Sequence, residues 1–156
     1  MANNIGKVAV LGGGSWATAL AKLLLQNCGQ LMWYMRRDDR IDEFLRLGHN
    51  PAYLTDVTFD TSRIEFSSDI NRVCSEADVL LLAMPSPYFK SHMEKVTADI
   101  SGKTIVSAIK GIVPDENQLI TDYMVERFGV ASRRELVISG PCHAEEVALD
   151  RPSYLT

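Results

Sequence analysis

The sequence predicts an α/β fold, in which a doubly wound, mostly parallel sheet forms a single domain over residues 1–156. Three observations lead to this prediction. Short apolar runs alternate with amphipathic stretches, three glycines follow the first apolar run, and the length suits one domain with its own core. Strands that alternate with helices are joined by right-handed crossovers, so most of the strands should be parallel.

In the first half of the chain, unbroken apolar runs indicate buried strands, and apolar residues three or four apart indicate helices. The predicted strands are 8–11, 30–35 and 64–66. The predicted helices are 15–26, 38–47 and a short one that Asp69 caps and that ends near Cys74. In the second helix, Ile41, Phe44 and Leu45 are expected to face inward. Residues 48–63, which include "HNPAYL", are predicted to form a polar loop.

The second half of the chain continues this alternation. Strands are predicted at 79–83, 104–108 and 136–139. A helix is expected to include Pro87 in its first turn and to run to about Asp99. Another is predicted over 117–128, where Gly129 ends it. The stretches "IKGIVP" and "GPCHAEEVA" are predicted to be loops.

Composition and charge exclude several classes of function. The formal net charge of −4 argues against a general nucleic-acid binder, and no apolar run approaches the roughly 20 residues that span a bilayer. The first ten residues lack the pattern of a secretory signal. The three cysteines lie far apart and the three histidines are scattered. We therefore expect a cytoplasmic protein with no disulfide framework and no metal site.

The turn after the first strand has the pattern G-x-G-x-x-A over residues 12–17. In the Rossmann-type fold, this turn holds the pyrophosphate of a dinucleotide. Gly12 permits the tight turn, Gly14 lets the backbone approach the phosphates, and Ala17 lets the helix pack closely on the strand. The free N–H groups and the dipole at the helix start then face the anion. The alternative is a plain glycine turn, but the strand–turn–helix context favours a dinucleotide.

The end of the second predicted strand bears on the choice between NAD and NADP. NAD enzymes usually have an acidic residue there, whereas an arginine accommodates the 2′-phosphate of NADP. Here Arg36 and Arg37 come first, which favours NADP with Arg36 as its ligand. In the alternative interpretation, Asp38 and Asp39 pair with these arginines in a solvated cluster. Trp33, inside the strand, is expected to pack in the core.

Four ordered motifs carry a more specific resemblance. They are "GGGSWATALA", "HNPAYL", "AIKGI" and "SGPCHAEEVA". The set resembles the bacterial-type NAD(P)-dependent glycerol-3-phosphate dehydrogenases, whose motifs look like G-x-G-S-W-G-T-A-L-A, N-x-x-Y-L, S-K-G-I and S-G-P-S-F-A-x-E-V-A. The resemblance covers the whole chain. It implies that 1–156 is the cofactor-binding domain and that the family's helical catalytic domain, with its general acid/base lysine, lies outside this chain.

The resemblance also implies roles for single residues. Cofactor contacts are expected from the glycine turn and from residues spread over the chain: Gly12, Gly14, Ser15, Trp16, Arg36, Tyr53, Lys110 and Ala144. Substrate contacts are expected from Lys110, Gly140 and Cys142. Lys110 is the expected catalytic contact, because a lysine beside the transferred hydride can hold the substrate oxygen. Alternatively, Lys110 is an ordinary loop lysine and Tyr53 only pins the long loop.

The chain departs from the family pattern at several positions. Ala17 replaces the usual third glycine, and Ala108 stands near Lys110 where the family tends to have a hydroxyl residue. Cys142 and His143 replace Ser or Thr and then Phe, which puts the substrate contact of Cys142 in doubt. A cysteine nucleophile with His143 as its base is disfavoured, because no orienting acid is evident. Glu145 and Glu146 are expected to cap a helix or lie on the surface.

The resemblance predicts an oxidoreductase that interconverts dihydroxyacetone phosphate and sn-glycerol 3-phosphate with NADP or NAD, for phospholipid synthesis. The full-length protein is expected to be a homodimer, and this chain alone to bind cofactor with little turnover. Two alternatives stay open: a nucleotide-binding redox sensor without catalysis, and a related dehydrogenase of hydroxy acids or sugar acids.

Overall fold

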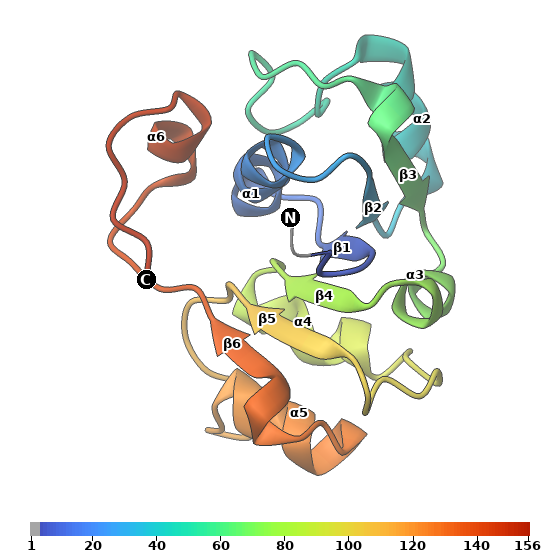
Figure 1. Cartoon of the computed structure of the whole chain (residues 1–156), viewed down its shortest axis with the longest axis vertical. Coiled ribbons are helices and arrows are strands. Elements are labelled where there is room, and N and C mark those ends of the chain that lie inside the picture. Colours follow the sequence, from blue (N-terminus) through green and yellow to red (C-terminus); the bar gives the residue numbers. More distant parts are fainter. Residues whose placement is uncertain (1–3) are drawn as a thin grey trace.

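A six-stranded, all-parallel sheet with helices on both faces forms the fold (Figure 1). The computed structural model describes residues 4–156. The strands follow the order β3-β2-β1-β4-β5-β6, and every pairing is parallel. They are β1 (Val8–Leu11), β2 (Leu31–Tyr34), β3 (Ile64–Ser67), β4 (Val79–Leu82), β5 (Thr104–Ser107) and β6 (Glu135–Val137). The predicted doubly wound α/β fold is thereby confirmed.

The strand order places β1 at the centre, beside both β2 and β4. Val10 of β1 lies opposite Trp33 on one side and Leu81 on the other. The chain builds outward from β1 to β3, then crosses back to β4 and builds outward in the other direction. In such sheets, ligands bind beyond the carboxyl ends of the strands, at the point where the order reverses. The fold therefore points to the end of β1 as the place for a site.

Six helices connect or flank the strands. They are α1 (Ser15–Leu25), α2 (Asp38–Leu47), α3 (Ile70–Glu76), α4 (Ser86–Met93), α5 (Ile120–Phe128) and α6 (Ala144–Ala148). Two 3₁₀ turns, Thr61–Arg63 and Ser132–Arg134, precede β3 and β6. As predicted, Asp69 caps α3 by accepting from two backbone N–H groups, and Gly129 ends α5 in the left-handed conformation.

The core lies in two layers, one on each face of the sheet. Alternate residues of a strand point to opposite faces. Ala9 and Leu11 therefore pack toward α3, α4 and α5, whereas Val8 and Val10 pack toward α1 and α2. Trp33 is fully buried in the second layer, as predicted, where its ring contacts aromatic rings of α2 and β3. A smaller cluster joins α6 to α1.

Several predicted boundaries were wrong, and distant side chains explain the clearest case. Helix α4 ends at Met93 and not near Asp99. The reason is Asn71 of α3, whose side-chain oxygen accepts from the backbone N–H groups of Thr97 and Ala98 and whose nitrogen donates to Lys95 O. These bonds take backbone groups that a longer helix would use.

Three other expectations also differ from the structure. Helix α5 begins at Ile120, because residues 113–118 form a turn closed by the Val113 N–H and Gln118 O. Leu45 is 48% exposed, since α2 buries only Ile41 and Phe44. The segment 140–148, predicted as a loop, contains the short helix α6.

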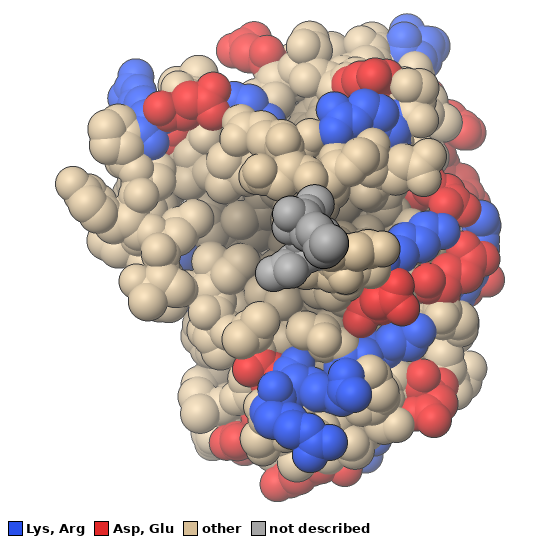
Figure 2. Space-filling model, viewed as in Figure 1, with Lys and Arg blue, Asp and Glu red and all other residues tan. Residues whose placement is uncertain are grey.

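Charge is mixed on the face that Figure 2 shows, where acidic and basic side chains are interspersed. This agrees with the small formal net charge of −4. Among residues 4–156, no helix combines the length and apolarity that crossing a bilayer requires.

Candidate functional site

The glycine turn between β1 and α1 is built for close approach. At Gly12, φ is +133°, and a Cβ would lie 2.7 Å from the carbonyl oxygen of Ala83. No side chain fits there, because β4 runs directly alongside. At Gly14, by contrast, a Cβ would meet no atom within 4 Å. The space in front of Gly14 is open, and α1 begins there without a side-chain cap. The turn thus fits the expected anion site.

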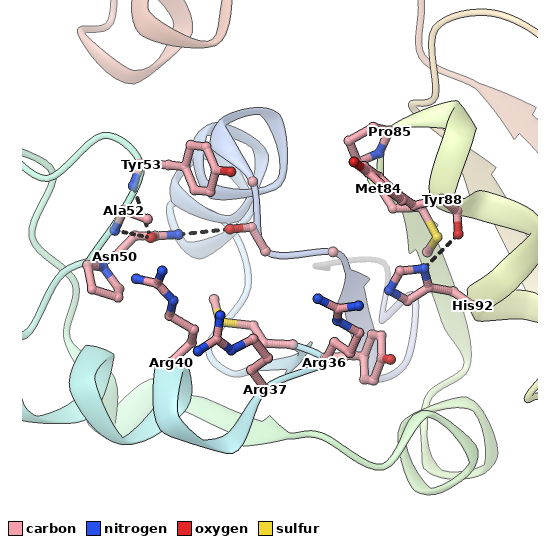
Figure 3. Close-up of a pocket in the computed structure, with 16 residues that line it drawn as sticks. Arg36, Arg37, Arg40, Asn50, Ala52, Tyr53, Met84, Pro85, Tyr88 and His92 are labelled. Carbon is pink, nitrogen blue, oxygen red and sulfur yellow. Dashed lines mark hydrogen bonds between the residues drawn. The ribbon is translucent and has the colours of Figure 1, made fainter.

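A cavity of about 360 Å³ lies on one side of this turn (Figure 3). We call it the first cavity. Its lining comes from the glycine turn, the segment from Tyr34 to Arg40, the loop after α2, and α4 with the two residues before it. Of the predicted cofactor residues, Gly12, Gly14, Arg36 and Tyr53 lie here. The position and the lining suit the adenosine half of a dinucleotide.

Three arginines line one side of the first cavity: Arg36, Arg37 and Arg40. Arg37 is paired with Asp39, and this contact raises the pKa of the guanidinium and lowers the pKa of the carboxyl. The predicted alternative of a solvated pair therefore applies to Arg37. Arg40 makes only a long contact with Glu43, at 3.9 Å. Among residues 4–156, no ion pair includes Arg36, so its charge is available to an anion.

Asn50 fixes the loop that closes the first cavity, and sequence reasoning missed it. Its side chain is buried, at 2% exposure. The side-chain oxygen accepts from the N–H groups of Ala52 and Tyr53, at 2.9 and 3.1 Å, and the nitrogen donates to Gly13 O at 3.1 Å. Tyr53 itself is 49% exposed. Asn50 is part of the motif "HNPAYL", in which Tyr53 is the predicted cofactor contact. In the structure, Asn50 and not Tyr53 pins the loop to the glycine turn, and the Tyr53 ring remains available to a ligand.

Two titratable side chains border the first cavity on the side of β2 and α4. Burial raises the pKa of Tyr34 and lowers the pKa of His92. The Nδ1 atom of His92 is 2.7 Å from Tyr88 O, and its ring packs edge-on against Tyr34. A lowered pKa favours the neutral imidazole, so the positive charge of this cavity comes chiefly from its arginines.

A second cavity, of about 290 Å³, lies on the other side of the glycine turn. It shares Gly14, Met84 and Pro85 with the first cavity and also contains Ser15, Trp16 and Lys110. The ammonium of Lys110 lies 5.4 Å from the centre of the Trp16 ring and donates to Cys142 O at 3.0 Å. The second cavity thus brings Ser15, Trp16 and Lys110 together, and Cys142 contacts this group through its backbone carbonyl.

Gly140, Cys142 and Ala144 lie in the segment after β6, outside both cavities. A Cβ at Gly140 would lie 2.1 Å from Tyr154 O, so the C-terminal segment crosses its backbone. The buried Cys142 thiol accepts from the Tyr154 N–H at 3.2 Å. Ala144 is buried against α1. These contacts are structural in this arrangement, and any role in binding stays a prediction.

The residues beside Cys142 do not form a nucleophile site. His143 is the N-cap residue of α6: its backbone carbonyl accepts from the Glu146 N–H at 3.1 Å, and the Glu146 carboxylate accepts from the His143 N–H at 3.4 Å. Glu146 is therefore a capping residue, as expected. Within residues 4–156, no three His, Cys, Asp or Glu side chains are grouped as metal ligands.

Comparison with known proteins gives the family. The family model described as "NAD-dependent glycerol-3-phosphate dehydrogenase N-terminus" matches residues 7–156. The NAD(P)+ glycerol-3-phosphate dehydrogenase of Lysinibacillus sphaericus is 34% identical over 152 residues, which are 96% of this chain and 45% of that protein. That of Bacillus subtilis is 36% identical over 152 residues, again 96% of this chain and 44% of that protein.

A solved structure agrees with the sequence relatives. The crystal structure of glycerol-3-phosphate dehydrogenase from Coxiella burnetii superposes with a TM-score of 0.81 at 26% identity, covering 96% of this chain and 45% of that one. The chain thus spans less than half the length of these relatives. It belongs to the NAD(P)-dependent glycerol-3-phosphate dehydrogenase family and corresponds to the family's N-terminal, cofactor-binding domain.

Proposed function

We propose that this chain is the cofactor-binding part of an enzyme that interconverts dihydroxyacetone phosphate and sn-glycerol 3-phosphate with NADPH or NADH. The observation that carries the proposal is that Gly14 borders both cavities. A dinucleotide whose pyrophosphate lies on the glycine turn would reach the arginines on one side and Lys110 on the other. Family membership supplies the substrate class.

Each half of the site has a defined task in this proposal. The nicotinamide, when bound, gives or accepts the hydride. Lys110 holds the substrate oxygen with its ammonium and offsets the charge that develops there, which requires it to exchange its bond with Cys142 O for one with the substrate. The proton transfer falls to a lysine in the family's second domain, which also excludes water from the reacting atoms. This chain alone is expected to bind cofactor with little turnover.

The charge of the first cavity favours NADPH over NADH. Arg36 is the cavity arginine without an ion pair among residues 4–156, and Arg40 is held only weakly by Glu43. A 2′-phosphate on the adenosine ribose would have both guanidinium groups within the same cavity. We further propose a cytoplasmic homodimer that supplies sn-glycerol 3-phosphate for phospholipid synthesis.

A titration of this chain with NADPH and with NADH, followed by calorimetry, tests the proposal. Saturable binding that is tighter for NADPH is expected. Arg36→Ala should remove most of the preference, whereas Arg46→Ala, on the exposed last turn of α2 outside the cavity, should keep it. Equal affinities for both cofactors would remove the NADPH preference. No binding of either by the chain or by a full-length protein would overturn the cofactor assignment.

A further inference from the structure

Three consecutive carbonyl groups of the glycine turn each accept a hydrogen bond from a side chain. The Trp33 indole N–H donates to Gly12 O at 2.7 Å, and the Asn50 amide donates to Gly13 O at 3.1 Å. The Thr18 hydroxyl donates to Gly14 O at 2.7 Å. We call Trp33, Asn50 and Thr18 the carbonyl-holding set. Its members come from three different parts of the fold: β2, the loop after α2, and α1.

The carbonyl-holding set lies inside the protein and is internally connected. Trp33 and Thr18 are fully buried, and Asn50 is 2% exposed. The Asn50 amide also donates to the Thr18 hydroxyl at 3.0 Å, so one bond links two members of the set. Gly14 O also accepts from the Thr18 backbone N–H, at 3.0 Å. Buried polar groups that bond to one another and to the backbone favour a single arrangement, because each lost bond leaves a buried group with fewer partners.

The direction of these carbonyls fixes the direction of the N–H groups. In a planar trans peptide, the C=O and the following N–H point in opposite directions. Holding the carbonyls of residues 12–14 toward the interior therefore directs the N–H groups of Gly13, Gly14 and Ser15 away from it. Among residues 4–156, none of these three N–H groups donates a hydrogen bond, so all three are free for an anion.

The glycines of the turn need to be held in this orientation by other residues. Three successive glycines have more backbone freedom than any other tripeptide, and ordering them when a ligand binds would lower the affinity. A carbonyl that turned outward would also face the phosphate oxygens and repel them. A turn that is held in place before binding avoids both effects.

We infer that Trp33, Asn50 and Thr18 are positioning residues that preorganise the glycine turn for the pyrophosphate of the cofactor. The inference rests on the proposed cofactor function. It gives Trp33 a second task beyond core packing. It also makes Thr18, inside a helix of otherwise apolar buried residues, part of the binding apparatus without touching the ligand.

Thr18→Val tests the inference, since valine keeps the shape and removes the hydroxyl. Calorimetry on the variant should show that its affinity for NADPH is lower than that of the parent chain by a factor of about five or more. This is the loss expected from one missing hydrogen bond. Thr18→Ser, which restores the hydroxyl, should recover the affinity. Adenosine 2′-monophosphate, which fits the first cavity but has no pyrophosphate, should bind both variants as it binds the parent chain. Trp33→Phe removes the bond from β2 to Gly12 O and should likewise weaken the binding of NADPH.

A second readout does not depend on the cofactor. ¹⁵N relaxation of the ligand-free chain should show more motion at the Gly13 and Gly14 amides in Thr18→Val and in Trp33→Phe than in the parent. Unchanged NADPH affinity and unchanged amide motion in both variants would overturn the inference. If neither the parent chain nor a full-length protein binds a dinucleotide, the proposed function fails, and the relaxation data still decide whether the carbonyl-holding set orders the turn.

Discussion

At the scale of single residues, Gly12 and Gly14 are both glycines, but the reason that glycine is needed differs between the two positions. Gly12 has a positive φ, and the backbone of Ala83 and Met84, directly after β4, comes within 3.0 Å of where a Cβ would lie, so the fold requires glycine here. Gly14 has an ordinary backbone conformation and open space in front of it. In the proposed function, glycine at position 14 is required by the phosphates that bind there and not by the fold.

Alanine substitutions should separate these two requirements. Gly12→Ala is expected to lower the free energy of unfolding by about 3 kcal/mol, through backbone strain and the contact with Ala83 O. Gly14→Ala should change it by less than about 1 kcal/mol but weaken NADPH binding about tenfold, because its methyl group occupies the approach of the phosphates. Urea unfolding and calorimetry measure the two effects. Equal binding by Gly14→Ala and the parent would contradict this account.

Burial should make Cys74 inert. It lies on α3, fully buried against the sheet, and burial raises the pKa of its thiol to about 12. At pH 8, iodoacetamide should alkylate the half-buried Cys28 and leave Cys74 unmodified, as mass spectrometry of the peptides would show. In guanidinium chloride all three cysteines should react. Rapid alkylation of Cys74 in the folded chain would show that α3 opens readily.

The residues that sequence reasoning missed are those whose role depends on distant partners. The spacing of "GGGSWA" predicts an anion site from local sequence alone, and the open space in front of Gly14 is consistent with that prediction. The role of Asn50 could not be predicted, because it depends on hydrogen bonds to Gly13 and Thr18, which are more than 30 positions away in the sequence. Trp33 was correctly predicted to be in the core, but its indole N–H finds Gly12 O only once β1 and β2 are paired.

At the scale of elements, apolar runs and glycine stops determined most boundaries, and tertiary hydrogen bonds determined the others. Strand β1 and helix α2 have the predicted limits, because a continuous apolar run and a Gly48 stop define them locally. Helix α4 is shorter than predicted, because Asn71 of α3 takes over the backbone groups at 95–98. Helix propensity carries no information about such a partner.

The C-terminal end of α1 depends on a partner of this kind. The Arg63 guanidinium donates to Leu25 O and Cys28 O at 2.5 and 2.6 Å, and to Gly29 O at 3.0 Å. Leu25 O is a carbonyl that the last turn of α1 leaves unsatisfied, and Cys28 O and Gly29 O belong to the turn that follows the helix. Arg63→Ala should therefore lower the free energy of unfolding by about 2 kcal/mol, measured by urea unfolding. Arg133→Ala, on the other 3₁₀ turn, is the matched control and should have little effect. A loss of the same size in both variants would contradict this role for Arg63.

His92 of α4 should make the free energy of unfolding depend on pH. Burial lowers the pKa of this histidine in the folded state below its ordinary value of 6.5. Between the folded-state pKa and 6.5 the unfolded chain binds more protons, so the free energy of unfolding should fall as the pH drops through this range and be fully retained above it. His92→Gln should make the profile flatter, as urea unfolding from pH 7.5 to pH 5 would show. An identical slope in both proteins would exclude His92 as the cause.

At the scale of the whole molecule, the segment after β6 differs from the rest. The sheet and its two core layers are continuous, whereas 139–156 returns over α1 and is held by the small cluster of α6, by Lys22 and by pairing between Ser139 and Thr156. In Figure 1, α6 lies beside α1, away from the helices that cover β4 and β5. A region with few buried apolar contacts opens locally before the rest.

Native-state hydrogen exchange should reveal this difference. The amides of β1 and β4 are expected to exchange only on global unfolding, and those of 144–149 considerably faster. Lys22 donates to Ala148 O at 2.5 Å and to Asp150 at 2.9 Å, so Lys22→Met should speed exchange in α6 alone. Lys95→Met, on a surface turn far from α6 in sequence and in a different layer, is the control. Equal protection of α6 and β1 would mean that the segment unfolds with the sheet.

The reversal of the chain at β1 also has a consequence for how the protein can change over evolution. Residues that line the first cavity come from positions 12–92, and the lysine side of the second cavity comes from 108–110. Among residues 4–156, the linings of the two cavities share only Gly14, Met84 and Pro85. In the proposed function, substitutions around Arg36 and Arg40 should therefore exchange one coenzyme for the other while leaving Lys110 and its surroundings unchanged. Coenzyme choice and this chain's part in substrate binding would then change independently in evolution.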